Sequence, residues 1–306
     1  MATEDNNIPD RRMCGTMEVH NRLLEQYPEC RARRAEISAA LETRLSGDPS
    51  FRRTCGLTTL PVVVHVVYNN DTENISDDQV SSQIEALNRD YRAQNPDLAN
   101  VPDVWKSLAQ DPLIEFALAS TDPDGKPTNG ITRTETDQIS FGQDDSVKSA
   151  ASGGADPWPS DKYLNIWVCT LSGGLLGYAQ FPGMPPNTDG VVILNTAFGT
   201  TGTATAPFNM GGMTVHEVGH WLDLKHIWGD SNNCGGTDFV DDTPNAQLPN
   251  FGKPTFPHVT CSNGPDGDMF VNYMDYVDDD TMIMFTSGQI SRMHAALEGS
   301  RSSIGS

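Results

Sequence analysis

The chain has 306 residues, with 20 Lys and Arg against 41 Asp and Glu, which gives a formal net charge of −21. This acidic balance argues against nucleic acid or an anionic membrane as the main partner. Charged residues make up 20% of the sequence and apolar residues 37%, a composition that supports a folded core rather than a disordered polyelectrolyte. The longest mostly apolar run, Leu60–Tyr68, is far shorter than the roughly 20 residues of a membrane span.

The charge is divided unevenly along the chain. Residues 1–53 contain nine Arg, no Lys and nine acids, whereas the other 253 residues contain 11 basic and 32 acidic residues. Because the planar guanidinium pairs well with carboxylates, this pattern favours an N-terminal segment that docks on the acidic body. The charge alone fits a helical hairpin of the same domain equally well. A helix is expected over Glu29–Leu45, followed by a loop and by a candidate exposed linker, Phe51-Arg52-Arg53.

From Leu60 onwards the pattern becomes mixed α/β. Leu60–Tyr68 predicts a buried strand, and Ser76–Asn95 predicts a helix whose apolar residues recur at helical spacing behind a serine cap. Further strands are expected over short runs between turn-forming residues: Leu113–Ser120, Tyr163–Thr170, Gly177–Phe181 and Gly190–Asn195. Residues 230–290 are rich in Asp, Asn, Gly and Pro. Such a long irregular stretch needs a metal, a disulfide or a functional reason to be ordered.

A metal-binding pattern lies within Met213–Asp230. His216 and His220 stand four residues apart, so on a helix they share one face and can hold one ion, with Glu217 beside that face. Catalytic zinc usually has a third protein ligand. His226 is the natural candidate, but an unbroken helix would carry it about 15 Å along the axis from His216.

The helix must therefore end between His220 and His226, and the chain must turn back. Asp223 lies in this interval and tolerates the left-handed backbone region that such a turn needs. Gly219 is unusual inside a helix, where it costs about 1 kcal/mol relative to Ala. Its missing side chain would let another segment of the chain pack close to the helix.

The spacing of His216, Glu217, His220 and His226, with Met274 downstream in the sequence NYMDY, resembles the metzincin zinc peptidases, which carry a methionine turn under the metal. The flanking sequences HEVGHWLDLKHIWGD and VDDTP resemble the pappalysin family. One departure is Asp223, which stands where metzincins usually have glycine.

The resemblance implies an α+β fold in which a twisted mixed sheet and an active-site helix lie over an irregular C-terminal subdomain. It implies a short pro-segment, residues 1–53, ahead of a catalytic domain, residues 54–306. Within that domain, an upper subdomain is expected over 54–226 and a lower one over 227–306.

The implied activity is that of a zinc endopeptidase. Zinc held by three neutral histidines lowers the pKa of a bound water toward about 7, and Glu217 is expected to act as the general base. Tyr276 follows Met274 by two residues and is expected to stabilise the oxyanion, with simple packing as the alternative. An edge strand that pairs with the substrate backbone is expected to include Gly177, Tyr178 and Ala179.

Specificity is expected from a pocket behind the methionine turn. Asp278-Asp279-Asp280 follows that turn, and a carboxylate at the pocket floor would select Arg or Lys just after the scissile bond. Asp280 is the predicted carboxylate. The alternative is that this acidic loop is simply solvated.

The resemblance also implies a structural calcium and a disulfide in the irregular region. The calcium ligands carried over are Asp238, Asp241 and Thr243, with Asp242 as a further candidate, because calcium prefers hard oxygen ligands. The disulfide joins Cys234 to Cys261, which flank this loop. Cys169 is expected to be buried and free in a strand, and Cys30 and Cys55 have no assigned partner.

Cys14 lies in the sequence Arg12-Met13-Cys14-Gly15-Thr16, and a thiolate is an excellent zinc ligand. The pattern resembles a cysteine switch, in which a pro-segment thiolate takes the fourth zinc position, with an ordinary surface cysteine as the alternative. An enzyme that prefers a basic residue after the cut would cleave before Arg52 or Arg53. Autolytic activation is therefore expected at this junction.

The expected location is secreted or extracytoplasmic, although Met1–Asp10 is polar and lacks the apolar stretch of a signal peptide. The expected partners are protein substrates and the pro-segment as inhibitor. One competing hypothesis is a non-catalytic adhesion protein that keeps zinc and calcium, against which Glu217 argues. Another is a zinc peptidase of a different clan with a downstream carboxylate ligand, against which His226 and Met274 argue.

Overall fold

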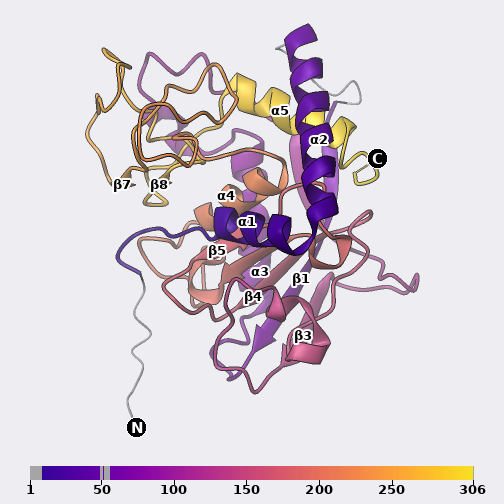
Figure 1. Ribbon diagram of the computed structural model, residues 1–306. Helices are drawn as coiled ribbons and strands as arrows, with labels where there is room; N and C mark the ends of the chain where they lie inside the picture. Colours follow the sequence, from indigo (N-terminus) through magenta and orange to yellow (C-terminus); the bar gives the residue numbers. More distant parts are fainter. Residues whose placement is uncertain (1–8, 49–50, 52–55, 306) are drawn as a thin grey trace.

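The computed structural model describes residues 9–48, 51 and 56–305 (Figure 1). Its centre is a mixed sheet in the order β2-β1-β4-β6-β5, with β3 also paired to β1. Only β5 runs antiparallel to its neighbour among the strands of this sheet in the described residues. The strands are β1 (Thr58–Tyr68), β2 (Ile114–Leu118), β3 (Ile131–Glu135), β4 (Leu164–Cys169), β5 (Gly177–Ala179) and β6 (Val191–Leu194). The expected mixed sheet is confirmed.

The long strand β1 organises the sheet. Its valines from Val62 to Val67 are buried, as expected for a central parallel strand that is covered on both faces. β2 pairs with the first half of β1 and β3 with the second half, so these two strands follow one another along the same edge. β3 was not predicted, because its sequence Ile-Thr-Arg-Thr-Glu is mostly polar and half exposed at the edge.

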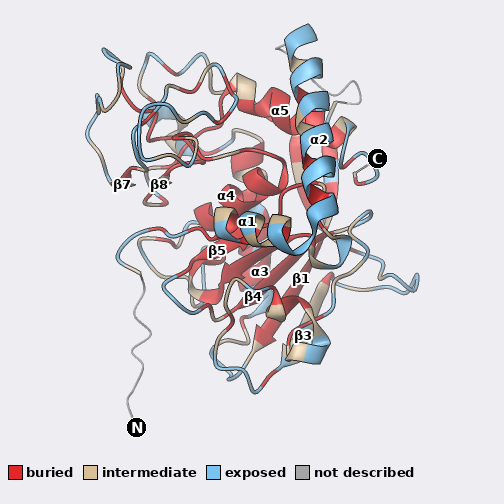
Figure 2. Cartoon of the chain, in the orientation of Figure 1, coloured by how far each residue is buried: buried red, intermediate tan, exposed pale blue. Residues whose placement is uncertain are grey.

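Two helices of the body pack together beside the sheet. The helix α3 (Asp77–Tyr91) begins at Ser76, whose hydroxyl accepts the Gln79 N–H at 3.1 Å, as the sequence predicted. It contacts β2 and the helix α4 (Gly212–Trp221), which in turn packs on β5 and β6. All ten residues of α4 are buried, and Figure 2 shows this helix in the red interior of the molecule. The zinc-motif helix is therefore fixed on all sides.

The lower part of the molecule, after α4, contains little regular structure. It has the short parallel pair β7 (Phe251–Gly252) and β8 (Tyr276–Val277), and it ends in the helix α5 (Ser287–Glu298). The predicted disulfide Cys234–Cys261 is present, with the two Cα atoms 5.6 Å apart. The irregular C-terminal subdomain is confirmed, and a covalent link is one source of its order.

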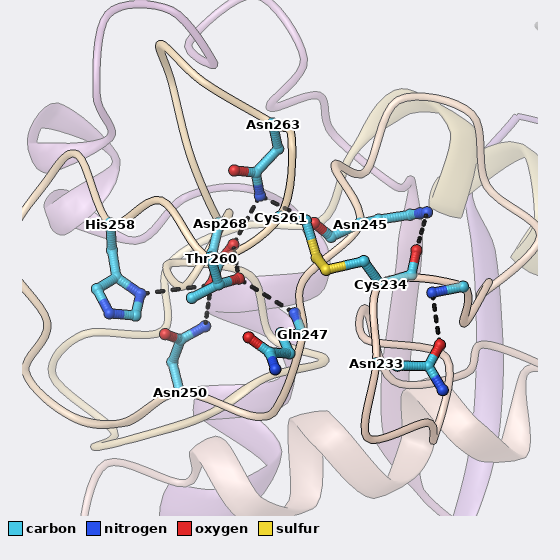
Figure 3. The surroundings of a disulfide bond; sticks show 11 residues. Asn233, Cys234, Asn245, Gln247, Asn250, His258, Thr260, Cys261, Asn263 and Asp268 are labelled. Carbon is cyan, nitrogen blue, oxygen red and sulfur yellow. Dashed lines mark hydrogen bonds and ion pairs between the residues drawn. A yellow bond between two sulfur atoms is a disulfide. The ribbon is translucent and has the colours of Figure 1, made fainter.

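A polar cluster next to the disulfide provides a second source of order. Figure 3 shows Thr260 and Asn263 converging on the buried carboxylate of Asp268. The Thr260 hydroxyl donates to Asp268 at 2.7 Å, and so does the Asn263 amide at 2.7 Å. Asn250 then joins this cluster to Asp275, which follows the methionine of the predicted turn. Side-chain hydrogen bonds replace the missing backbone ladders here.

The N-terminal segment forms two helices on the surface of the body. The helix α1 (Thr16–Gln26) lies against β5, and α2 (Pro28–Gly47) packs along α5, as Figure 1 shows in indigo and yellow. The predicted helix Glu29–Leu45 is confirmed. Arg52 and Arg53 of the predicted linker, and Cys55, lie outside the described residues. None of the helices in the described residues combines the length and apolar character that a membrane span requires.

Candidate active site

The three histidines of the motif converge because α4 ends where the sequence requires. The helix stops at Trp221, and Asp223 adopts the predicted left-handed backbone with φ of 75°. The Nε2 atom of His220 lies 3.1 Å from that of His216 and 3.0 Å from that of His226. Nitrogen ligands at zinc distances around a tetrahedral ion stand roughly 3.4 Å apart. The geometry therefore fits one zinc ion.

The hydrogen bonds of the three rings point to the same conclusion. Each Nδ1 faces an acceptor at 2.5–2.8 Å. For His216 it is the backbone oxygen of Tyr273, for His220 that of Leu224, and for His226 the carboxylate of Asp230. Nδ1 is therefore the protonated nitrogen, and three Nε2 lone pairs meet at one point. Burial lowers the pKa of His216, and burial lowers that of His220 to about 3, so these rings stay neutral. A cation removes the repulsion between the lone pairs.

The methionine turn lies directly under this centre. Met274 is fully buried, and a Cβ atom built on Gly219 would stand 2.5 Å from its sulfur. The helix glycine is therefore the position at which another segment packs close, as the sequence predicted. Any larger residue at position 219 would push Met274 and the turn away from the histidines.

Cys14 joins the three histidines from the N-terminal segment. Among the described residues, one group of His, Cys, Asp and Glu ligand atoms is compact enough to hold a metal, and it consists of Cys14, His216, His220 and His226, all within 4.8 Å of one another. Cys14 is buried, so the alternative of an ordinary surface cysteine is wrong. Burial and the nearby Glu217 raise the pKa of its thiol in the absence of a metal. The sulfur is therefore close enough to the three histidines to share one metal ion with them.

The N-terminal segment follows the edge of β5 on its way to the metal centre. The Gly15 N–H donates to the Gly177 oxygen at 2.9 Å, and the Leu176 N–H donates to the Met13 oxygen at 3.0 Å. The bridge between Cys14 and Gly177 is parallel. The segment thus uses the outer edge of β5, the strand that the sequence analysis assigned to substrate pairing, and Tyr178 of this strand is fully buried.

Two residues assigned to catalysis also contact this segment. Glu217 is fully buried and accepts the Thr16 hydroxyl at 2.7 Å, and burial raises its pKa to about 7. The Tyr276 hydroxyl donates to the Cys14 oxygen at 3.3 Å, and its ring centre lies 4.9 Å from that of His226. Burial raises the pKa of Tyr276 well above its usual value, which keeps the phenol a hydrogen-bond donor. Tyr276 therefore lies beside the metal-site histidines, and its role in oxyanion stabilisation stays a prediction.

The specificity prediction needs a correction. Asp280 is exposed and pairs with Lys253 at the surface. The carboxylate that meets a basic side chain behind the methionine turn is Asp279, whose Oδ1 lies 2.5 Å from the Arg12 guanidinium, with both side chains fully buried. Neighbouring acids in an irregular loop face different ways, so the sequence could not select between them.

Asp279 is held in place by the start of α4. Its Oδ2 accepts the Met210 N–H at 2.7 Å and the Gly212 N–H at 3.2 Å, which leaves Oδ1 aimed at Arg12. The guanidinium of Arg12 also donates to the Val277 oxygen at 3.1 Å. The sequence did not predict that Arg12 and Thr16 contact residues of the candidate active site. The one signal was the excess of arginine ahead of an acidic body, which predicted docking without naming the residues.

Two of the four predicted calcium ligands, Asp238 and Thr243, are hydrogen-bonded to each other, and the other two lie apart from this pair. Asp238 accepts the Thr243 hydroxyl at 2.7 Å, Asp242 accepts the Gly288 N–H at 2.8 Å at the start of α5, and Asp241 is exposed. Burial raises the pKa of Asp238 to about 7. In the part of the chain that the structure describes, the compact metal-holding group does not include these aspartates. The calcium assignment stays a prediction.

Comparison with known proteins agrees with this geometry. A peptidase family model described as pregnancy-associated plasma protein-A matches residues 148–298. An extracellular metalloprotease of Arthroderma benhamiae is 30% identical over 269 residues, which cover 86% of each chain. The chain belongs to the pappalysin family of zinc metallopeptidases. Its relatives also include an extracellular metalloprotease of Pyricularia oryzae, 29% identical over 92% of this chain and 86% of that one.

Two solved structures extend the likeness to the whole fold. A promirolysin mutant from Tannerella forsythia has a TM-score of 0.87 and 43% identity, and the match covers 96% of this chain and 97% of that chain. Mature mirolysin from the same organism, in complex with a cleaved peptide, has a TM-score of 0.76 and 52% identity over 78% of this chain and 90% of that chain. This pappalysin is therefore a zinc metalloendopeptidase with a zymogen-type structure, and neither the adhesion hypothesis nor the other-clan hypothesis is supported.

Proposed function

We propose that this pappalysin is the latent form of a secreted endopeptidase that cuts before Arg or Lys and removes its own pro-segment, residues 1–53. The observation that carries the proposal is the buried ion pair between Arg12 and Asp279. Arg12 stands two residues before Cys14, whose sulfur lies next to the three histidines. One short stretch of the N-terminal segment thus reaches both the three histidines and a buried carboxylate that pairs with a basic side chain.

The chemistry follows from the placement of the side chains. Zinc, when held by His216, His220 and His226, polarises the scissile carbonyl and lowers the pKa of a water. Glu217 accepts the proton of the attacking water and later delivers it to the leaving amine. The Tyr276 hydroxyl donates to the oxyanion, in the place where it now donates to the Cys14 oxygen.

The specificity proposal rests on Asp279. Arg12 reaches its carboxylate from a backbone that runs along β5, and the same strand edge would align a substrate. An ionised carboxylate in a buried pocket binds a basic side chain by a charge-assisted hydrogen bond, which contributes about 1.5–3 kcal/mol. A substrate with Arg or Lys after the scissile bond would place its cation where Arg12 now lies.

Latency is proposed to come from the cysteine switch. The Cys14 sulfur lies within 4.8 Å of the ligand atoms of the three histidines, which is close enough to take the fourth metal position that a water needs for hydrolysis. The fold likeness supports this role, because promirolysin matches 96% of this chain and mature mirolysin only 78%. Removal of the segment would open the fourth position of the metal and the pocket of Asp279 together.

The proposed activation site is the junction at residues 51–53. Phe51 still packs beside α2 and α5, with the Arg44 guanidinium 4.9 Å from its ring centre. Arg52 and Arg53 follow immediately and lie outside the described residues. Cleavage before either arginine fits an enzyme that prefers a basic residue after the cut. The extracellular relatives support secretion, and a structural calcium ion in the region 238–243 remains part of the proposal.

A peptide library tests the specificity of the activated protein. Purified protein, freed of residues 1–53, should cut peptides before Arg and Lys and lose this activity when zinc is chelated. A cleavage pattern that favours acidic or apolar residues after the scissile bond would contradict the assignment of Asp279.

A further inference from the structure

Thr16 makes a contact that neither the cysteine switch nor the Arg12 pair explains. It is the first residue of α1 and is fully buried. Thr16 directly follows Gly15, the N-cap residue of α1, and its hydroxyl bonds to groups outside its own helix. The Thr16 Oγ1 donates to Glu217 Oε2 at 2.7 Å and accepts the Ala179 N–H at 2.7 Å.

Both partners of this hydroxyl are groups that the active enzyme needs. Glu217 must hold a water in order to act as general base, and a water is also a small hydroxyl donor. The Ala179 N–H lies on the outer edge of β5, because the other edge of β5 is paired with β6. A substrate that adds a strand to this edge would accept that N–H with its own backbone oxygen. One side-chain hydroxyl therefore replaces a water on one side and a substrate carbonyl on the other.

We propose that Glu217 and the Ala179 amide form a hydroxyl-binding subsite, and that Thr16 occupies it as a second inhibitory contact, separate from the thiol of Cys14. The inference rests on the proposed latency and deepens it. The ligand of this subsite is the hydroxyl of a side chain that stands two residues after the thiol that faces the metal. The contact disables the general base and the substrate strand, whereas the thiol blocks the metal.

The surrounding geometry shows how the segment delivers the hydroxyl to this point. A Cβ atom at Gly15 would stand 2.6 Å from the Gln143 side chain and 3.2 Å from Leu175, so glycine lets the chain pass between Cys14 and Thr16. The Thr16 backbone N–H faces the Cys14 sulfur at 3.4 Å. Substitution of the Thr16 side chain leaves this backbone contact in place, and the two inhibitory contacts can therefore be separated by mutation.

The experiment compares full-length zymogens that carry Thr16→Val, Thr16→Ser or Cys14→Ala. Valine keeps the branched shape of threonine and removes the hydroxyl, whereas serine keeps the hydroxyl. Each zymogen is incubated alone, and its conversion is followed by intact mass. The released enzymes have the same sequence, because the substituted residue leaves with the segment, so differences in rate report on latency.

Thr16→Val is expected to speed conversion about tenfold or more, the usual effect of losing a hydrogen bond to a charged group. Thr16→Ser is expected to convert within about threefold of wild type. Cys14→Ala is expected to speed conversion on its own, and the double variant Cys14→Ala/Thr16→Val should convert faster than either single variant, with a coupling between the two because the residues are in contact. The reactivity of Cys14 toward a thiol reagent should stay at the wild-type level in the Thr16→Val zymogen.

The outcomes separate this inference from the proposed function. If Cys14→Ala accelerates conversion and Thr16→Val does not, the hydroxyl subsite is wrong and the cysteine switch stands. If Thr16→Val and Thr16→Ser accelerate equally, or if Cys14 becomes reactive in Thr16→Val, packing rather than the hydroxyl is responsible and the inference is overturned. If neither Cys14→Ala nor Thr16→Val changes the rate, the proposed latency itself fails.

Discussion

The metal centre and the segment that covers it are held by different kinds of contact. The centre is fixed within the body, by the partners of the three histidine Nδ1 atoms and by Met274 under Gly219. The segment is held by arginines that reach carboxylates of the body, in the pairs Arg12–Asp279, Arg22–Asp145 and Arg34–Asp223, and by a few apolar side chains such as Val19 and Leu23. The contacts that orient the three histidines therefore do not include residues of the segment.

The difference shows most clearly between α4 and α2. Every residue of α4 is buried, whereas α2 buries only Cys30, Arg34 and Leu41 among its described residues, and Figure 2 shows most of it in pale blue. Arg34 lies against Asp223, the residue at the turn that brings His226 to the metal. Asp223 keeps a second partner, Arg292 of α5, at 2.8 Å. The turn thus retains a cation of the body when the segment departs.

The largest expected effect separates chemistry from metal binding. Glu217→Ala should lower kcat/KM of the activated enzyme by about 10²–10⁴, because the proton acceptor is lost. The zinc content should stay at one per chain, since the carboxylate is not one of the metal ligands. Activity assays beside elemental analysis check this. A zinc-free preparation of the active wild type would contradict the role of the three histidines.

The next effect tests which aspartate selects the substrate. Asp279→Asn should reduce kcat/KM for peptides with Arg after the cut by about 10–100-fold, because a charge-assisted hydrogen bond is replaced by an amide that faces the guanidinium. Asp280→Asn is the matched control, since Asp280 pairs with Lys253 at the surface and should leave the preference unchanged. Equal losses in both variants would show that the general acidity of the loop matters, not the pocket carboxylate.

A smaller effect concerns the support of the third ligand. Asp230 accepts the Nδ1 proton of His226 at 2.5 Å, and Trp228 stacks on the same ring at 4.3 Å. Asp230→Ala should weaken zinc binding by about 10–100-fold, and Asp230→Asn should recover part of the loss because it keeps an acceptor oxygen. Competition with a chromophoric chelator measures this directly. Substitution of the exposed Asp137 by Ala is the control, and an unchanged zinc affinity in Asp230→Ala would remove this role.

How far the sequence could predict the site depended on the range of the interactions. Local geometry fixed the convergence of His216, His220 and His226, the left-handed turn at Asp223 and the close approach at Gly219, and all three are confirmed. The choice between Asp279 and Asp280, and the contact of Thr16 with Glu217, depend on how distant loops face one another. Periodicity and spacing carry no information about such orientations, which is why these residues emerged only from the structure.

The smallest expected effect concerns calcium and the lower subdomain. If calcium binds in the region of Asp238, whose pKa burial raises to about 7, the ion would offset the cost of a buried carboxylate. Removal of calcium should then lower the Tm by on the order of 5 °C, the shift expected when a ligand at about 100 times its Kd is withdrawn. Thermal unfolding in millimolar calcium and in a calcium-selective chelator gives the comparison. Coincident curves would contradict a structural ion.

The most direct test of the whole account follows both ends of the zymogen in one experiment. Wild type and Glu217→Ala are incubated side by side without added protease, and peptide hydrolysis, intact mass and the new N-terminus are recorded together. The account predicts that wild type gains activity as it loses the segment, with a new N-terminus at Arg52 or Arg53, while Glu217→Ala stays intact. Maturation of Glu217→Ala at the same junction and rate would contradict self-activation, and full activity of the uncleaved wild type would contradict inhibition by the segment.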